Sequence, residues 1–163
     1  MNKNLGILFN DLKKKNHNKI VIKFSEEEQY SYLALDHLSE NFINFFNKMK
    51  IKKDDKIVLE SIKNINSYAI MVACLKMGVS YTFVDLGEAP ERYKLILKQL
   101  KPKKIFTFSK KLTFKNCVLL DINKIKNIKN TKLKKKYNIK NISHTAYIMF
   151  TSGSTGKPKG VKI

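Results

Sequence analysis

The sequence contains 163 residues, of which 43% are hydrophobic, and its formal net charge is +20. This length supports one domain with a hydrophobic core, and no apolar run approaches the ~20 residues that span a bilayer. The N-terminus also lacks an apolar signal segment with a small-residue cleavage site, so we expect a cytoplasmic protein.

The composition does not favour metal or disulfide chemistry. The two cysteines, Cys74 and Cys117, stand in apolar segments without a CxxC spacing, and the three histidines are scattered along the chain. Because free cysteine usually behaves as a small hydrophobic residue, we expect two buried, unreactive thiols.

The positive charge has two interpretations. Clustered lysines neutralise phosphates, which would suit a nucleic acid or another anionic surface. However, every basic residue except Arg92 is a lysine, whereas base recognition and forked phosphate contacts favour arginine. Lysine, asparagine and isoleucine are enriched together, as expected from an A/T-rich coding sequence. This bias makes nucleic acid the less favoured partner.

The first half of the chain predicts alternating helices and strands. Apolar residues recur at helical spacing over 4–15, and a strand over 19–24 then precedes a glutamate-rich turn. Ser31 can cap a helix that continues to about residue 49. A strand follows at 56–61, and then a mostly apolar helix at 65–78, where Gly78 can adopt the left-handed conformation that ends a helix.

The second half continues this alternation. A strand over 79–85 is followed by a helix that starts near Pro90 and ends before Pro102. The remaining predicted strands lie at 103–108, 117–121 and 145–150. The run at 123–141 is rich in lysine and has no acidic residue, so it predicts a solvated linker.

This order of elements indicates an α/β fold, with a mainly parallel sheet flanked by helices. We expect the strands near 56–60, 80–84, 104–108 and 145–150 to share that sheet.

A glycine-rich loop, TSGSTGKPKG, follows the last of these strands at 151–160. Its glycines allow backbone N–H groups to approach a ligand, its hydroxyls can donate hydrogen bonds, and its lysines carry positive charge. These properties suit a polyphosphate. The candidate phosphate-binding residues are Thr151, Ser152, Gly153, Ser154, Thr155, Gly156, Lys157, Lys159 and Gly160.

The loop differs from the common phosphate loop of NTPases. The motif GxxxxGK[ST] would need glycine at 151 and serine or threonine at 158, where Thr151 and Pro158 stand. Pro158 favours an extended Lys157, so the loop is expected to connect two strands rather than to open a helix. A simple surface turn is the alternative, because the same residue types are common in turns.

The ordered string AYIMFTSGSTGKPKGVKI resembles the glycine-rich signature of the adenylate-forming (AMP-binding) superfamily. That superfamily includes acyl-CoA synthetases, amino-acid adenylation domains of peptide synthetases and D-alanine carrier-protein ligases. Three earlier segments resemble it in the expected order: YSYLALDHLSENFINFF, IKKDDKIVLES and CLKMGVSYTFVDLGEAPERYKLILKQLKPKKIFT. In the third, Asp85, Pro90, Glu91 and Arg92 resemble the amino-acid-activating branch. Thr82 and Phe83 depart from it where a proline usually stands nearby, so the branch stays open.

The resemblance implies an ATP-dependent ligase. A carboxylate would attack the α-phosphate of Mg-ATP, giving an acyl or aminoacyl adenylate and pyrophosphate. The acyl group would then pass to coenzyme A or to the phosphopantetheine arm of a carrier protein. Residues 151–160 would hold the β- and γ-phosphates.

The resemblance also implies that the other functional segments follow this loop. They are the adenine site, the carboxylate pocket, the magnesium-binding acidic residue and the small C-terminal domain with its catalytic lysine. We therefore expect residues 1–163 to be a partial N-terminal AMP-binding domain, from a truncated or split reading frame or a fragment, without catalytic residues and inactive by itself. The alternative function is a basic protein that binds phosphate or nucleic acid without catalysis.

Overall fold

A computed structural model describes residues 4–87, 90–108, 116–120, 145–152 and 157–163. Its centre is a four-stranded parallel sheet in the order β4-β3-β5-β6. These strands are β3 (Lys56–Glu60), β4 (Ser80–Val84), β5 (Lys104–Thr107) and β6 (Cys117–Leu119). Helix α3 (Ile65–Met77) connects β3 to β4, and helix α4 (Pro90–Leu100) lies between β4 and β5 in the chain. The predicted α/β class with a parallel sheet is confirmed.

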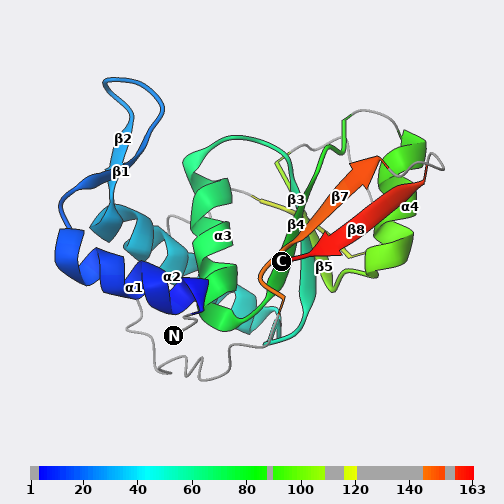
Figure 1. The fold of residues 1–163 in the computed structure, drawn as a ribbon, viewed down its shortest axis with the longest axis horizontal. Helices are drawn as coiled ribbons and strands as arrows, with labels where there is room; N and C mark the ends of the chain where they lie inside the picture. The colour runs from blue at the N-terminus through cyan, green and yellow to red at the C-terminus, as the bar shows by residue number, and fades with distance from the viewer. Residues whose placement is uncertain (1–3, 88–89, 109–115, 121–144, 153–156) are drawn as a thin grey trace.

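Helices cover both faces of the sheet (Figure 1). Successive side chains of a strand point to opposite faces, and in β3 this alternation separates two hydrophobic clusters. Ile57 and Leu59 pack with residues of α3 and of helix α2 (Tyr32–Lys48), whereas Val58 packs with Ile96 and Leu100 of α4. The strands are therefore apolar on both sides.

The N-terminal elements lie on the α2–α3 side of the sheet. They are helix α1 (Leu5–Asn16) and an antiparallel hairpin of β1 (Ile20–Lys23) and β2 (Gln29–Ser31). The sequence predicted α1 and β1 but not the three-residue β2. Two local predictions are confirmed: the Ser31 hydroxyl accepts a hydrogen bond from Ala34 N at 3.2 Å, and Gly78 ends α3 with φ of 69°.

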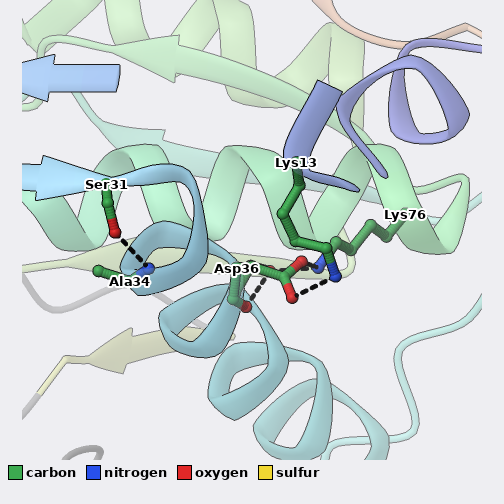
Figure 2. Close-up of polar contacts among 6 residues, drawn as sticks. Lys13, Ser31, Ala34, Asp36 and Lys76 are labelled. Carbon is green, nitrogen blue, oxygen red and sulfur yellow. Dashed lines mark hydrogen bonds and ion pairs between the residues drawn. The ribbon is translucent and has the colours of Figure 1, made fainter. Parts of the chain in front are cut away.

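A buried ionic cluster joins the three N-terminal helices (Figure 2). Asp36 of α2 accepts hydrogen bonds from Lys76 of α3 at 2.6 Å and from Lys13 of α1 at 2.9 Å. Lys76 also donates to the Ser39 hydroxyl at 2.7 Å and lies 5.5 Å from the centre of the Phe9 ring. Asp36 is 3% exposed and Lys76 is 6% exposed, so both charges are inside the protein.

The strand predicted at 145–150 needs a correction. Strand β7 (Ile148–Ser152) pairs antiparallel with β8 (Pro158–Lys162), and the two form a separate hairpin. Its link to the parallel sheet is an isolated bridge between Tyr147 and Tyr81 of β4, beside which Ser80 Oγ donates to Thr145 O at 2.6 Å. Because β8 is close to β7 in the sequence, pairing the two strands in a hairpin has a small entropic cost of loop closure, which favours β8 as the partner of β7.

Other predictions have mixed outcomes. Cys74 is fully buried, and burial raises the pKa of its thiol, as expected of an unreactive cysteine. Cys117 is only half-buried, so the buried-thiol prediction is wrong there. The lysine-rich run at 123–141 lies outside the described residues. In the described part of the chain, no helix has both the length and the apolar character needed to cross a membrane.

Candidate phosphate-binding site

The glycine-rich loop is framed by the β7–β8 hairpin. The register pairs Ser152 with Pro158, Thr151 with Lys159 and Phe150 with Gly160. The predicted strand-to-strand connection is therefore confirmed. The four central residues, 153–156, lie outside the described residues, so the structure places five of the nine candidates: Thr151, Ser152, Lys157, Lys159 and Gly160.

Thr151 and Lys159 lie side by side on an exposed face of the hairpin. Directly paired residues of an antiparallel ladder share a face, and both residues are solvent-exposed. Thr151 Oγ1 donates a long hydrogen bond of 3.5 Å to Lys159 O. We call residues 151–152 and 157–160, which flank the centre of the loop, its two arms. A hydroxyl donor and an ammonium group are thus presented together at these arms.

The positive charges of the loop are not neutralised within the described structure. Lys157 and Lys159 are exposed, and neither forms an ion pair with another described residue. No acidic residue follows Asp121 in the sequence. Exposed ammonium groups without a carboxylate partner can bind an anionic ligand without first breaking a salt bridge.

The opposite side of the hairpin is packed against the domain. Ile148 is buried and belongs, with the half-buried Phe150, to the cluster around Ile96 of α4. In addition, Gln99 Nε2 of α4 donates to Pro158 O at 2.9 Å. These contacts fix the arms of the loop relative to α4, which lies beside the hairpin in Figure 1. Sequence reasoning did not find Gln99, because its partner is 59 residues away.

Gly160 has a packing role in this hairpin. A Cβ at this position would lie 3.1 Å from the Phe150 ring and 3.3 Å from Ile148 Cγ2. Both distances are shorter than ordinary van der Waals contact. Gly160 therefore allows the two strands to pack over the apolar cluster, and its phosphate contact stays a prediction.

A cavity of about 340 Å³ lies next to these arms. It is bounded by the end of β4, by α4 and by Phe150 of β7, and its charged lining residues are Asp85 and Arg92. In the sequence, Asp85 and Arg92 were noted only because they resemble a motif of the amino-acid-activating branch. The sequence contains no signal for a cavity, because Phe150 reaches this place only through the tertiary fold.

Comparison with known proteins agrees with this architecture. The sequence profile of the family described as AMP-binding enzyme matches residues 9–163. The chain belongs to the AMP-binding enzyme family. It is 30% identical over 142 residues to the nonribosomal peptide synthetase GRA1 of Gibberella zeae, a match that covers 85% of this chain and 2% of that protein. It is 29% identical over 139 residues to a D-alanine–D-alanyl carrier protein ligase of Streptococcus pyogenes, covering 83% of this chain.

Solved structures share the fold of this AMP-binding chain. The N-terminal subdomain of Klebsiella oxytoca NpsA superimposes with a TM-score of 0.87 and 19% identity, covering 100% of this chain and 43% of that one. VinN in complex with 3-methylaspartate gives a TM-score of 0.85 and 15% identity, covering 98% of this chain and 47% of that one. The chain spans 27% of the length of the D-alanine ligase.

Proposed function

We propose that this chain supplies the phosphate-binding loop of an ATP-dependent ligase that converts a carboxylic or amino acid into an acyl adenylate and then into a thioester. The observation that carries the proposal is the exposed set of Thr151, Ser152, Lys157 and Lys159 on the arms of the loop, in a chain of the AMP-binding family. Residues 153–156 join them by sequence. Residues 1–163 would then form the N-terminal part of the AMP-binding domain.

The proposed chemical role is stabilisation of the leaving group. Pyrophosphate gains negative charge as it departs from the α-phosphate, and fixed donors and cations that face this charge lower the barrier. Lys157 and Lys159 would supply the positive charge, and the Thr151 hydroxyl would supply a hydrogen bond. The Gln99–Pro158 contact at 2.9 Å holds one arm in place before the ligand arrives.

Magnesium is expected to accompany ATP in such a reaction. Among the described residues, no group of three or more His, Cys, Asp and Glu side chains could hold a metal ion. We assign no metal-binding residue to this chain and derive no step through the metal. No catalytic residue is assigned either, because the role proposed for the loop residues is to bind and orient phosphates.

The substrate class is proposed from the relatives. GRA1 is named a nonribosomal peptide synthetase, and the streptococcal relatives are named D-alanine–D-alanyl carrier protein ligases. These names favour an amino acid as the substrate and a phosphopantetheinyl carrier protein as the thiol acceptor. Coenzyme A remains the alternative acceptor, as in acyl-CoA synthetases.

The test is carboxylate-dependent ATP–pyrophosphate exchange, measured with mixed amino and fatty acids on the protein purified from its natural source. Lys157→Ala is expected to slow exchange by about 10²-fold, the usual effect of losing one charge-stabilising contact. Gly156→Val should also slow exchange, because a branched side chain replaces the small residue of the loop. Lys63→Ala is the matched control, since Lys63 is exposed and lies outside the loop.

Exchange at the wild-type rate in both loop variants would rule the loop out of phosphate binding. We expect the isolated 163-residue chain to bind phosphate without catalysing exchange, and measurable exchange by that chain would contradict this part of the proposal.

A further inference from the structure

The cavity between β4, α4 and β7 has the composition of a small ligand site. Its volume is about 340 Å³, and apolar side chains such as Phe83, Ile96 and Phe150 line much of it. Two charged residues, Asp85 and Arg92, also line it. An apolar pocket with a few polar groups is the usual form of a ligand site.

Arg92 is chemically unusual in this chain. It is the only arginine, although the sequence has a lysine at every other basic position. Its guanidinium can hold two oxygens of one phosphoryl group in a fixed, forked geometry that a lysine ammonium cannot reproduce. A side chain with this property therefore lines a cavity of the described structure.

Arg92 is also available for a ligand. It is exposed and forms no ion pair with any described residue, and the neighbouring Glu91 pairs instead with Lys94 at 3.1 Å. Asp85 shares the cavity but does not pair with Arg92. Its Oδ1 accepts a hydrogen bond from Gly87 N at 3.0 Å, and the residue is exposed to water, which weakens its repulsion of an anion.

The cavity adjoins the arms of the phosphate loop. Phe150, which lines the cavity, directly precedes Thr151, the first candidate phosphate-binding residue. The second arm is tied to the same helix as Arg92, through the hydrogen bond from Gln99 to Pro158. The cavity thus lies on the packed face of the hairpin, with Phe150, whereas Thr151 and Lys159 lie on its exposed face.

We propose that this cavity is a phosphoryl subsite in which Arg92 binds a phosphate group of the nucleotide or of the departing pyrophosphate. This inference rests on the proposed function and adds to it a positively charged residue that comes from α4, outside the loop. A carboxylate could also bind the guanidinium fork. The phosphoryl group is favoured because the hairpin beside the cavity carries two further cations, Lys157 and Lys159, at its exposed end.

The test is isothermal titration of the complete 163-residue chain with inorganic pyrophosphate, and with glycine as a carboxylate probe. Arg92→Gln is expected to weaken pyrophosphate binding about 10-fold or more, because a charge-assisted forked contact is lost. Arg92→Lys should restore part of the affinity through charge alone. Lys98→Gln is the matched control: it removes the same charge from the same helix, at an exposed residue that neither lines the cavity nor pairs with Glu91.

The outcomes separate this inference from the proposed function. If Arg92→Gln binds pyrophosphate like the wild type while Lys157→Gln loses affinity, the subsite is wrong and the loop function stands. If the two loop lysines can be replaced without effect while Arg92 cannot, the subsite stands and the loop assignment is wrong. Equal losses for Arg92→Gln and Lys98→Gln would assign the binding to net charge and overturn the subsite. The subsite would also be overturned if the wild-type protein bound glycine but not pyrophosphate. Absence of pyrophosphate binding by the wild type would overturn both proposals.

Discussion

Two groups of lysines on opposite sides of the molecule have different environments. On the helical side, Lys76 and Lys13 are held by Asp36 in a cluster that joins α1, α2 and α3 (Figure 2). On the hairpin side, Lys157 and Lys159 are exposed and have no acidic partner among the described residues.

This difference separates structural charges from charges that can bind a ligand. A charge inside a protein costs several kcal/mol of desolvation unless a partner compensates it. Lys76 cannot leave Asp36 without that cost, so it can only fix the positions of the helices. The loop lysines are already in water, and an arriving polyphosphate replaces only water around them. Net charge alone would not have distinguished the two groups.

The largest expected effect is the loss of the carboxylate from the helical cluster. Asp36→Ala leaves the 6%-exposed Lys76 as an unpaired buried charge, and breaking a buried pair in this way typically costs about 3–5 kcal/mol. Urea unfolding measures the loss. Glu27→Ala, at an exposed turn residue, serves as the control and should change stability by less than about 0.5 kcal/mol. A loss below about 1 kcal/mol for Asp36→Ala would mean that the cluster is not structural.

Acid should weaken the helical cluster as well. Burial by itself raises the pKa of the Asp36 carboxyl, but hydrogen bonds and charges from Lys76 and Lys13 outweigh burial and hold this pKa below its ordinary value of 3.8. The contribution of Asp36 is therefore complete above its unfolded pKa and is lost as the pH falls through its folded pKa.

We expect the free energy of unfolding to fall more steeply below about pH 4 in the wild type than in the double variant Asp36→Leu/Lys76→Met, which has no cluster to protonate. Urea unfolding at a series of pH values from 6 to 3 checks this expectation. Parallel curves for the two proteins would show that Asp36 does not govern the acid response.

Contact between α1 and α3 offers a sharper test of the helical side. Gly6 is buried in α1, and a Cβ there would lie 2.5 Å from Leu75 O. Glycine to alanine normally stabilises a helix by about 1 kcal/mol, but overpacking at this contact should instead destabilise the protein by about 1–3 kcal/mol. Thermal or urea unfolding decides the sign, with the exposed Lys14→Ala on the same helix as control. A more stable Gly6→Ala variant would show that α1 does not pack closely on α3.

The smallest expected effect concerns the cap of α2, which positions Asp36 one turn later. Ser31→Ala removes the acceptor for Ala34 N and should cost about 1 kcal/mol. Ser31→Asp keeps an acceptor and should retain most of the stability. If the two variants unfold at the same urea concentration, the hydrogen bond from Ala34 N to the side chain at position 31 does not contribute to stability.

Local signals in the sequence predicted much of this fold. Ser31, Gly78 and Pro158 each act on the backbone within a few residues, so the helix start, the helix end and the strand-to-strand loop could be inferred from single positions. The alternation of apolar segments likewise predicted the parallel sheet.

Features that depend on distant partners could not be inferred. Lys76 meets Asp36 across 40 residues of sequence, and nothing near either residue indicates the pair. The same applies to β7, whose place relative to β4 depends on the contact between Tyr81 and Tyr147. Arg92 and Phe150 also come together only in the fold. The sequence singled out the loop residues as candidates, but it could not indicate the cavity beside them.

The central claim, that the hairpin side binds the phosphates of ATP, can be tested directly by amide chemical shifts of the ¹⁵N-labelled chain during titration with Mg-ATP. We predict that the shifts of Thr151, Ser152, Lys157, Lys159 and Gly160 move with ATP concentration, while the amides of Asp36 and Lys76 stay unchanged. Shifts confined to the helical side, or no shifts at the hairpin at saturating ATP, would contradict the claim.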